Sequence, residues 1–129
     1  MVAFGKFEAK KENGQFFLEV EPDLCPEVWY HMKKKEARLM DISGVEDDRL
    51  KVVYHFDVEG KLFHVIVPVP ADNPKIKSIC KAFPAAVLYE RELQEMFGIL
   101  VVDHPNMQPL FLPDELAGKT PGRRFTAKD

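Results

Sequence analysis

The chain has 129 residues, of which 46% are hydrophobic and 30% are charged, and it contains two cysteines. These ordinary globular values exclude a wholly disordered chain, and the length predicts one domain with a single hydrophobic core. The net charge of -3 gives no electrostatic reason to expect nucleic acid as a partner. No apolar run approaches the roughly 20 residues of a membrane-spanning helix, and the N-terminus lacks the apolar segment of a signal peptide, so we expect a cytoplasmic protein.

The first third of the chain predicts a hairpin followed by a helix. Asn13-Gly14 is a strong hairpin signal and precedes a strand over residues 15–20. Pro26 suits the first turn of a helix over residues 26–36. The inward side chains expected on that helix are Val28, Trp29 and Met32.

The middle of the chain predicts a second hairpin, the clearest in the sequence. After a strand over residues 38–43, residues 50–58 alternate strictly between apolar and polar positions. Glu59-Gly60 then makes a tight turn into a dense apolar strand over residues 61–69. Pro68 and Pro70 end that strand because proline cannot donate a ladder hydrogen bond.

Residues 72–102 predict two helices and a strand. Asn73 and Pro74 have the spacing of an N-cap and first position, which predicts a helix over residues 74–82 with Ile76, Ile79 and Cys80 inward. A second helix is expected over residues 84–97, ended by a left-handed Gly98 and followed by a strand over residues 99–102.

The order of elements predicts an α+β fold, an antiparallel sheet with helices packed on one face. We expect residues 1–105 to form this domain. Prolines 105, 109, 113 and 121 predict an extended proline-rich C-terminal arm over residues 106–129, without a core of its own. Because the arm carries Met107, Leu110, Phe111 and Leu112, it must bury them on this domain or on a partner.

The helix over residues 84–97 concentrates the charged side chains of interest. At about 100° per residue, Ala86, Tyr89, Leu93, Met96 and Phe97 are expected on the inward face. The outward face then carries Glu90, Arg91, Gln94 and Glu95, with Arg91 and Glu95 one turn apart and able to pair. Such a face is solvated, catalytic or a docking surface. An acid-base enzyme using Glu90, Glu92 and Glu95 is one interpretation, although Glu90 and Glu92 point in different directions.

Metal and thiol chemistry receive weaker support. His55 and His64 lie on neighbouring strands of the predicted hairpin and are expected to approach each other, and Asp103-His104 is a local pair of ligand types. No His-x-x-x-His spacing occurs, and lone histidines are usually hydrogen-bonded structural residues. Cys25 and Cys80 have no Cys-x-x-Cys spacing and are predicted to be reduced, partly buried thiols.

A family resemblance favours docking. The run Glu90-Arg91-Glu92, with Glu95, Met96-Phe97-Gly98 and then His104-Pro105, resembles the signature of the C-subunit family of respiratory complex I (NADH-quinone oxidoreductase). That family includes the small subunit of energy-converting membrane-bound hydrogenases. The preceding Ser78-Ile79 and Phe83-Pro84 resemble the family's lead-in to this helix. The chain departs from complex I members at Gln108-Pro109 and in its short tail, while Leu112-Pro113-Asp114-Glu115 resembles the hydrogenase-type relatives.

The resemblance implies a cofactor-free structural subunit in the hydrophilic arm of an energy-converting hydrogenase or complex I-like oxidoreductase. Its expected partners are the large catalytic subunit, which it braces, and a small iron-sulfur subunit. Iron-sulfur clusters, and in hydrogenases nickel-iron, belong to those partners. The chain itself would be peripheral on the cytoplasmic face of the membrane, without a span of its own. The expected interface residues are Glu90, Arg91, Glu92, Glu95, His104 and Pro105.

Overall fold

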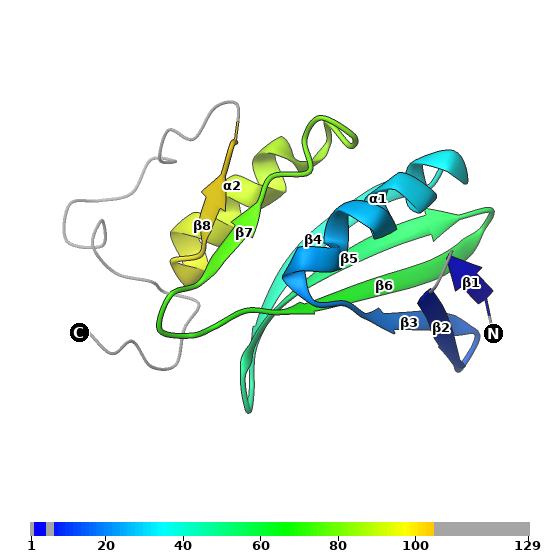
Figure 1. Ribbon diagram of the computed structural model, residues 1–129, viewed down its shortest axis with the longest axis horizontal. Helices are drawn as coiled ribbons and strands as arrows, with labels where there is room; N and C mark the ends of the chain where they lie inside the picture. The colour runs from blue at the N-terminus through cyan, green and yellow to red at the C-terminus, as the bar shows by residue number, and fades with distance from the viewer. Residues whose placement is uncertain (1, 5–6, 105–129) are drawn as a thin grey trace.

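A computed structural model of the chain describes residues 2–4 and 7–104 and has an α+β architecture (Figure 1). The main sheet has six strands in the order β1-β2-β3-β6-β5-β4, all antiparallel except for the parallel pair β3 and β6. The predicted arm over residues 106–129, its boundary at residue 105 and Pro105 itself lie outside the described residues. The strands of this sheet are β1 (Val2–Phe4), β2 (Phe7–Glu12), β3 (Gln15–Glu19), β4 (Arg38–Glu46), β5 (Leu50–Val58) and β6 (Lys61–Pro68).

Both predicted hairpins are confirmed, and in each the turn residues adopt the left-handed conformation that a tight two-residue turn needs. Asn13 and Gly14 have φ of 51° and 77° between β2 and β3. Glu59 and Gly60 have φ of 54° and 82° between β5 and β6. The second turn fixes the register so that His55 lies directly opposite His64.

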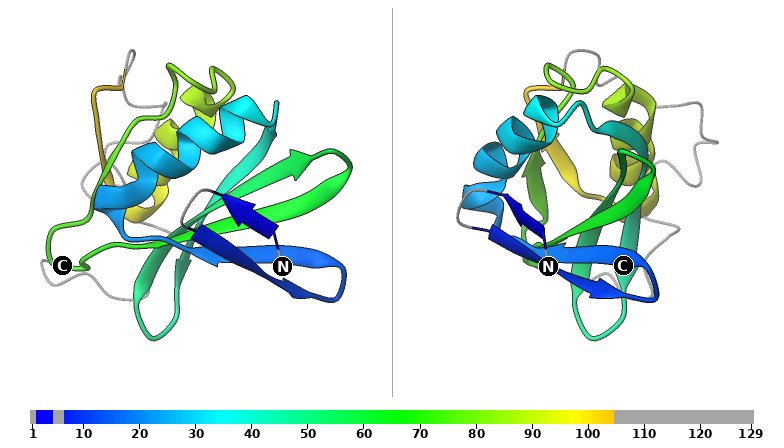
Figure 2. Two further views of the ribbon diagram at one scale, coloured as in Figure 1. Left: turned by 45° about the vertical axis from the view of Figure 1, so that its right-hand side comes forward. Right: turned by 90° about the vertical axis from the view of Figure 1, so that its right-hand side faces the viewer.

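Helix α1 (Cys25–Lys34) follows the short 3-10 turn η1 (Pro22–Leu24) and lies across the sheet (Figures 1 and 2). As predicted, its proline sits in the first turn and its buried face carries Val28, Trp29 and Met32. The Trp29 ring packs on Tyr54 and Phe56 of β5, with centroids 4.6 and 5.8 Å away. The core therefore lies between α1 and the inward face of β5.

Helix α2 (Ala86–Phe97) packs against β4, on the same face of the sheet. The two elements approach most closely at Gly44, where an added Cβ would lie 2.6 Å from the Phe97 ring. Gly44 pairs with Val52, whose side chain is buried like that of Tyr54. Both helices thus cover one face of a mostly antiparallel sheet, as the sequence predicts. Gly98 ends α2 with φ of 70°, as expected.

The prediction of a helix over residues 74–82 is wrong. The segment instead forms the short strand β7 (Lys75–Lys77), parallel to β8 (Leu100–Val102), and then a turn. Leu100 N–H donates to Pro74 C=O, and Ser78 N–H donates to Val102 C=O. The inward prediction for Ile76, Ile79 and Cys80 is nevertheless confirmed, since all three are buried. The spacing of these three residues allows either a helix or this extended path. Pairing with β8 stabilises the extended path.

Candidate docking helix and its buried glutamate

The inward face of α2 is rotated from the predicted one, and Glu90 lies on it. Glu90 is 0% exposed, whereas Met96, expected inward, is 43% exposed. Ala86 and Leu93 are buried as predicted, and Glu90 falls between them on the helical repeat. The assignment of Glu90 to the outward face is therefore wrong. A buried carboxylate is costly unless hydrogen bonds compensate it, so its partners explain why it is tolerated.

Three donors from the turn after β7 converge on the Glu90 carboxylate. Ser78 Oγ donates to Oε1 at 2.7 Å, the Ile79 backbone N–H donates to Oε2 at 2.8 Å, and the Cys80 thiol donates to Oε1 at 3.0 Å. Ser78 Oγ also accepts the Cys80 backbone N–H at 3.2 Å. The Glu90 side chain thus accepts the hydrogen bonds that this turn offers before the chain enters α2. We call Ser78, Ile79, Cys80 and Glu90 the carboxylate cluster.

His104 connects the end of β8 to the first turns of α2. Its Nε2 lies 2.9 Å from the Val87 carbonyl oxygen and 3.8 Å from Glu90 Oε1. Contact with a carbonyl places the proton on Nε2, because a carbonyl oxygen only accepts. His104 therefore holds together two segments of this chain, and its expected interface role stays a prediction.

Cys80, Glu90 and His104 present one ligand atom each within 4.8 Å of one another, a spacing compatible with a metal ion. The hydrogen bonds at these atoms argue otherwise. Burial, the largest cause, and the neighbouring Glu90 raise the pKa of the Cys80 thiol to about 11, although Ser78 opposes them, so that without a metal ion the sulfur is a thiol that donates to Glu90. His104 Nε2 faces a carbonyl oxygen rather than presenting a lone pair. The geometry supports a hydrogen-bonded cluster better than a metal centre.

The outward face of α2 combines apolar and charged side chains in one row. Leu88, Glu92 and Met96 recur every four residues and are all exposed, Leu88 at 58%. Beside this row, Arg91 Nε, Gln94 Oε1 and Glu95 Oε1 are enclosed but have no hydrogen-bond partner among the described residues. The anticipated Arg91–Glu95 pair therefore does not form between these atoms. We call Leu88, Arg91, Glu92, Glu95 and Met96 the outer α2 face.

The three glutamates proposed for acid-base chemistry do not converge. Glu90 is enclosed and saturated by donors, Glu92 is exposed on the opposite side, and Glu95 is half-buried. A small groove of about 240 Å³ between α2 and β4 is lined by Glu92 but by neither of the other two. No two of these carboxylates line the same one of the two main grooves of the described residues, so this arrangement does not support their joint use in catalysis.

His55 and His64 do approach each other, on the face of the sheet away from the helices. Their Nδ1 atoms are 2.7 Å apart, His55 Nε2 is 3.0 Å from Ser43 Oγ, and His64 Nε2 is 2.6 Å from Gln15 Oε1. Burial lowers the pKa of both rings, and the charge of His55 lowers that of His64 further. A hydrogen-bonded chain across four strands accounts for both rings. Cys25 and Cys80 are free, buried thiols, as predicted.

Sequence reasoning missed the partners of Glu90. The resemblance singled out Ser78-Ile79, but the predicted helix over residues 74–82 obscured the fact that a turn there exposes a hydroxyl and a backbone N–H. The available signal was a glutamate placed between apolar positions of an otherwise inward helical face. Leu88 and Met96 were also missed as a surface pair.

Comparison with known proteins gives a consistent result. Residues 18–127 match the family described as "Respiratory-chain NADH dehydrogenase, 30 Kd subunit". The C-subunit of the F420H2 dehydrogenase of Methanosarcina mazei is 34% identical, over 93% of this chain and 84% of that protein. The C-subunit of the NADH-quinone oxidoreductase of Chloroherpeton thalassium is 32% identical over 80% of this chain. The chain spans only 47% of that second relative.

Solved structures show the same fold. A chain of the membrane-bound sulfane sulfur reductase, described as an archaeal respiratory membrane complex, superposes with a TM-score of 0.84 over 95% of this chain at 23% identity. A trypsin-resistant fragment of Nqo5 superposes with a TM-score of 0.68 over 78% of this chain at 24% identity. Within the described residues, neither helix is long and apolar enough to cross a membrane.

Proposed function

Because the chain belongs to the family of the 30 kDa subunit of respiratory-chain NADH dehydrogenase, we propose that it is a non-catalytic scaffold subunit of a membrane-associated oxidoreductase complex. It would brace the large catalytic subunit through the outer α2 face. Relatives that are named as the C-subunits of two such enzymes support the assignment to a multi-subunit complex.

The observation that carries this proposal is the difference between the inward and the outward side of α2. The carboxylate cluster fixes the inward side of the helix, and the outer α2 face is left with exposed Leu88 and Met96 beside buried polar atoms that have no partner in the described chain. An enclosed polar atom without a partner costs roughly 1–3 kcal/mol, and a partner surface supplying the missing bonds would recover it. Apolar side chains among charges are the composition expected of a docking patch.

Within the family we propose the hydrogenase-type or a related branch rather than a true NADH-quinone oxidoreductase. The resemblance of Leu112-Pro113-Asp114-Glu115 to the hydrogenase-type relatives and the 34% identity with the F420H2 dehydrogenase subunit support this choice. A hydrogenase-type complex, an F420H2 dehydrogenase-type complex and a true NADH-quinone oxidoreductase are distinguished by the co-purifying large subunit. Two Cys-x-x-Cys motifs in it would indicate a nickel-iron hydrogenase, and their absence one of the other two.

We further propose that this chain holds no cofactor, that iron-sulfur clusters reside in partner subunits including a small iron-sulfur subunit, and that the complex places it on the cytoplasmic side of the membrane. Elemental analysis tests the first point. The purified chain should contain less than one-tenth equivalent of iron, nickel or zinc, whereas the complex should contain several equivalents of iron. A stoichiometric metal in the isolated chain would support a metal-dependent domain instead.

The test of docking is co-purification of the large subunit with a tagged chain. Arg91→Ala should reduce recovery at least tenfold, about 1.4 kcal/mol of binding free energy, because arginines near the centre of an interface often contribute that much. Arg38→Ala is the matched control, since Arg38 is exposed on β4 and its one ion pair within the described part of the chain is with Asp57 at 3.4 Å. Equal recovery for both variants and the unchanged chain would sink the docking proposal.

A further inference from the structure

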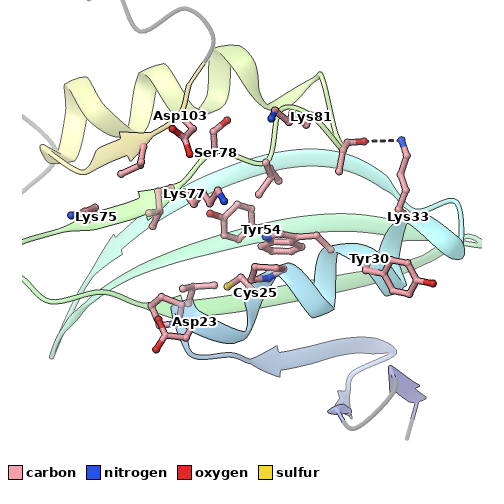
Figure 3. A pocket seen from close by; sticks show the side chains of 18 residues that line it. Asp23, Cys25, Tyr30, Lys33, Tyr54, Lys75, Lys77, Ser78, Lys81 and Asp103 are labelled. Atoms are coloured by element: carbon pink, nitrogen blue, oxygen red, sulfur yellow. Dashed lines mark hydrogen bonds between the residues drawn. The ribbon is translucent and has the colours of Figure 1, made fainter.

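A groove of about 820 Å³ lies between α1 and β7, away from the outer α2 face (Figure 3). Its apolar lining includes Trp29, Tyr54 and Ile79, all buried side chains of the core. Exposed Tyr30 lies at its margin. The volume falls in the range of roughly 300–1,000 Å³ that binding clefts occupy. The groove therefore has buried core side chains at its floor and a volume sufficient for a bound chain segment.

The charge of this groove differs from that of the whole protein. Four lysines and two aspartates line it, an excess of two positive charges in a chain whose net charge is -3. Lys33 Nζ donates to the Ala82 carbonyl at 2.7 Å and closes one end (Figure 3). Lys75, Lys77 and Lys81 are exposed along the other wall. An occupant with acidic side chains suits this rim.

Among the described residues β7 pairs with β8 alone, so the other edge of this wall has no strand beside it. Pro74 C=O and Ser78 N–H bond to β8. Since backbone groups alternate in direction along a strand, those of Lys75 and Lys77 point away from β8. Figure 1 shows β7 between β8 and α1, so this edge faces the groove. A free edge beside an apolar floor is the arrangement that binds extended peptides by strand addition.

We propose that this groove receives an extended segment of a neighbouring subunit, with alternating acidic and apolar side chains, which adds as a strand to the free edge of β7. Its main chain would bond to the backbone groups of Lys75 and Lys77. Its apolar side chains would pack on the groove floor formed by Trp29 and Ile79, and its carboxylates would pair with the lysine rim. The inference rests on the proposed function, because it requires a partner subunit, and it identifies a second contact on another side of the molecule.

The experiment compares amide hydrogen exchange in the purified complex and in the free full-length chain. In the complex, exchange at Lys75 and Lys77 should slow at least tenfold. Carbodiimide treatment of the complex should join Lys77 or Lys81 to an aspartate or glutamate of another subunit. Lys75→Glu combined with Lys77→Glu should abolish both effects, whereas Lys61→Glu, at the exposed β5–β6 turn outside the groove, should leave them unchanged.

The outcomes separate the two proposals. An assembled complex with unslowed exchange at both lysines would overturn this inference and leave the proposed function standing. Cross-links from the groove lysines to Asp114 or Glu115 of this chain would overturn it too, because the chain's own C-terminal segment or a second copy would then be the occupant. Failure to co-purify with any larger subunit would overturn both.

Discussion

The two sides of α2 carry the same residue type under opposite conditions. Glu90 is enclosed and accepts three hydrogen bonds, while Glu92, two residues on, is exposed in a row with Leu88 and Met96. Burial makes the first carboxylate a fixed part of the fold, because its three donors bond to no other acceptor within the described residues. Exposure makes the second available to another protein. A charged motif is therefore divided by helical geometry into a structural half and an exposed half, and recognition is the role that we propose for the second.

The largest effect expected from breaking this contrast comes from Glu90→Ala. The substitution strands the Ser78 hydroxyl, the Ile79 N–H and the Cys80 thiol in a buried site. We expect the free energy of unfolding to fall by about 3 kcal/mol, since each stranded group costs roughly 1 kcal/mol or more. Urea unfolding followed by the fluorescence of Trp29, the one tryptophan, measures it.

Glu92→Ala is the matched control for Glu90→Ala. A substitution at an exposed position away from such clusters usually changes stability by less than about 0.5 kcal/mol. The contrast predicts the reverse ranking for assembly, where Glu92→Ala weakens recovery of the large subunit. Equal losses of stability for both variants would contradict the division of α2 into two halves.

The next effect concerns the close approach of α2 to β4. In Gly44→Ala the new Cβ would lie 2.6 Å from Phe97 Cδ2 and Cε2, so the ring must move. Overpacking of this kind costs about 1–3 kcal/mol. Adding Phe97→Leu should recover part of the loss, and a double-mutant cycle by urea unfolding should show coupling above about 0.5 kcal/mol. Additive effects would mean that the two residues do not press on each other.

A smaller loss is expected from Ser78→Ala, which removes one donor to Glu90 and the acceptor of the Cys80 N–H. The loss in unfolding free energy should be about 1–2 kcal/mol. Cys80→Ser retains a donor of similar size and should cost less than Ser78→Ala in the same assay. If Cys80→Ser were the more damaging, packing of the sulfur rather than the hydrogen bond would hold that side of the cluster.

Local features of the fold could be predicted from the sequence, whereas features that depend on distant residues could not. The extent of α2 near its C-terminus followed from helical periodicity and from Gly98, both local properties. The proximity of His55 and His64 followed from a two-residue turn, which leaves the hairpin one register. Glu90 was misplaced because charge alone argues for solvent, and only the turn at Ser78 and Ile79 makes its burial acceptable.

That turn could not be predicted from its own residues. Ile76, Ile79 and Cys80 have a spacing that fits a helix, and Asn73-Pro74 resembles a helix start. The extended path depends on β8, more than twenty residues later, and on the carboxylate of Glu90. Both are long-range contacts. The interface role of the outer α2 face depends on a second protein and so stays a prediction.

The smallest expected effect concerns the pH dependence of stability. It compares the enclosed Glu90 with His55 and His64, two polar side chains that are only partly buried. Burial lowers the pKa of both rings below the usual 6.5, so between that value and the folded pKa the unfolded chain binds more protons than the folded one. The stability that the pair contributes is complete above pH 6.5 and falls as the pH drops below it. Urea midpoints at pH 7.5 and pH 5.5 should differ less in His64→Gln than in the unchanged chain, and an identical pH dependence would show that the two rings do not act as a neutral pair.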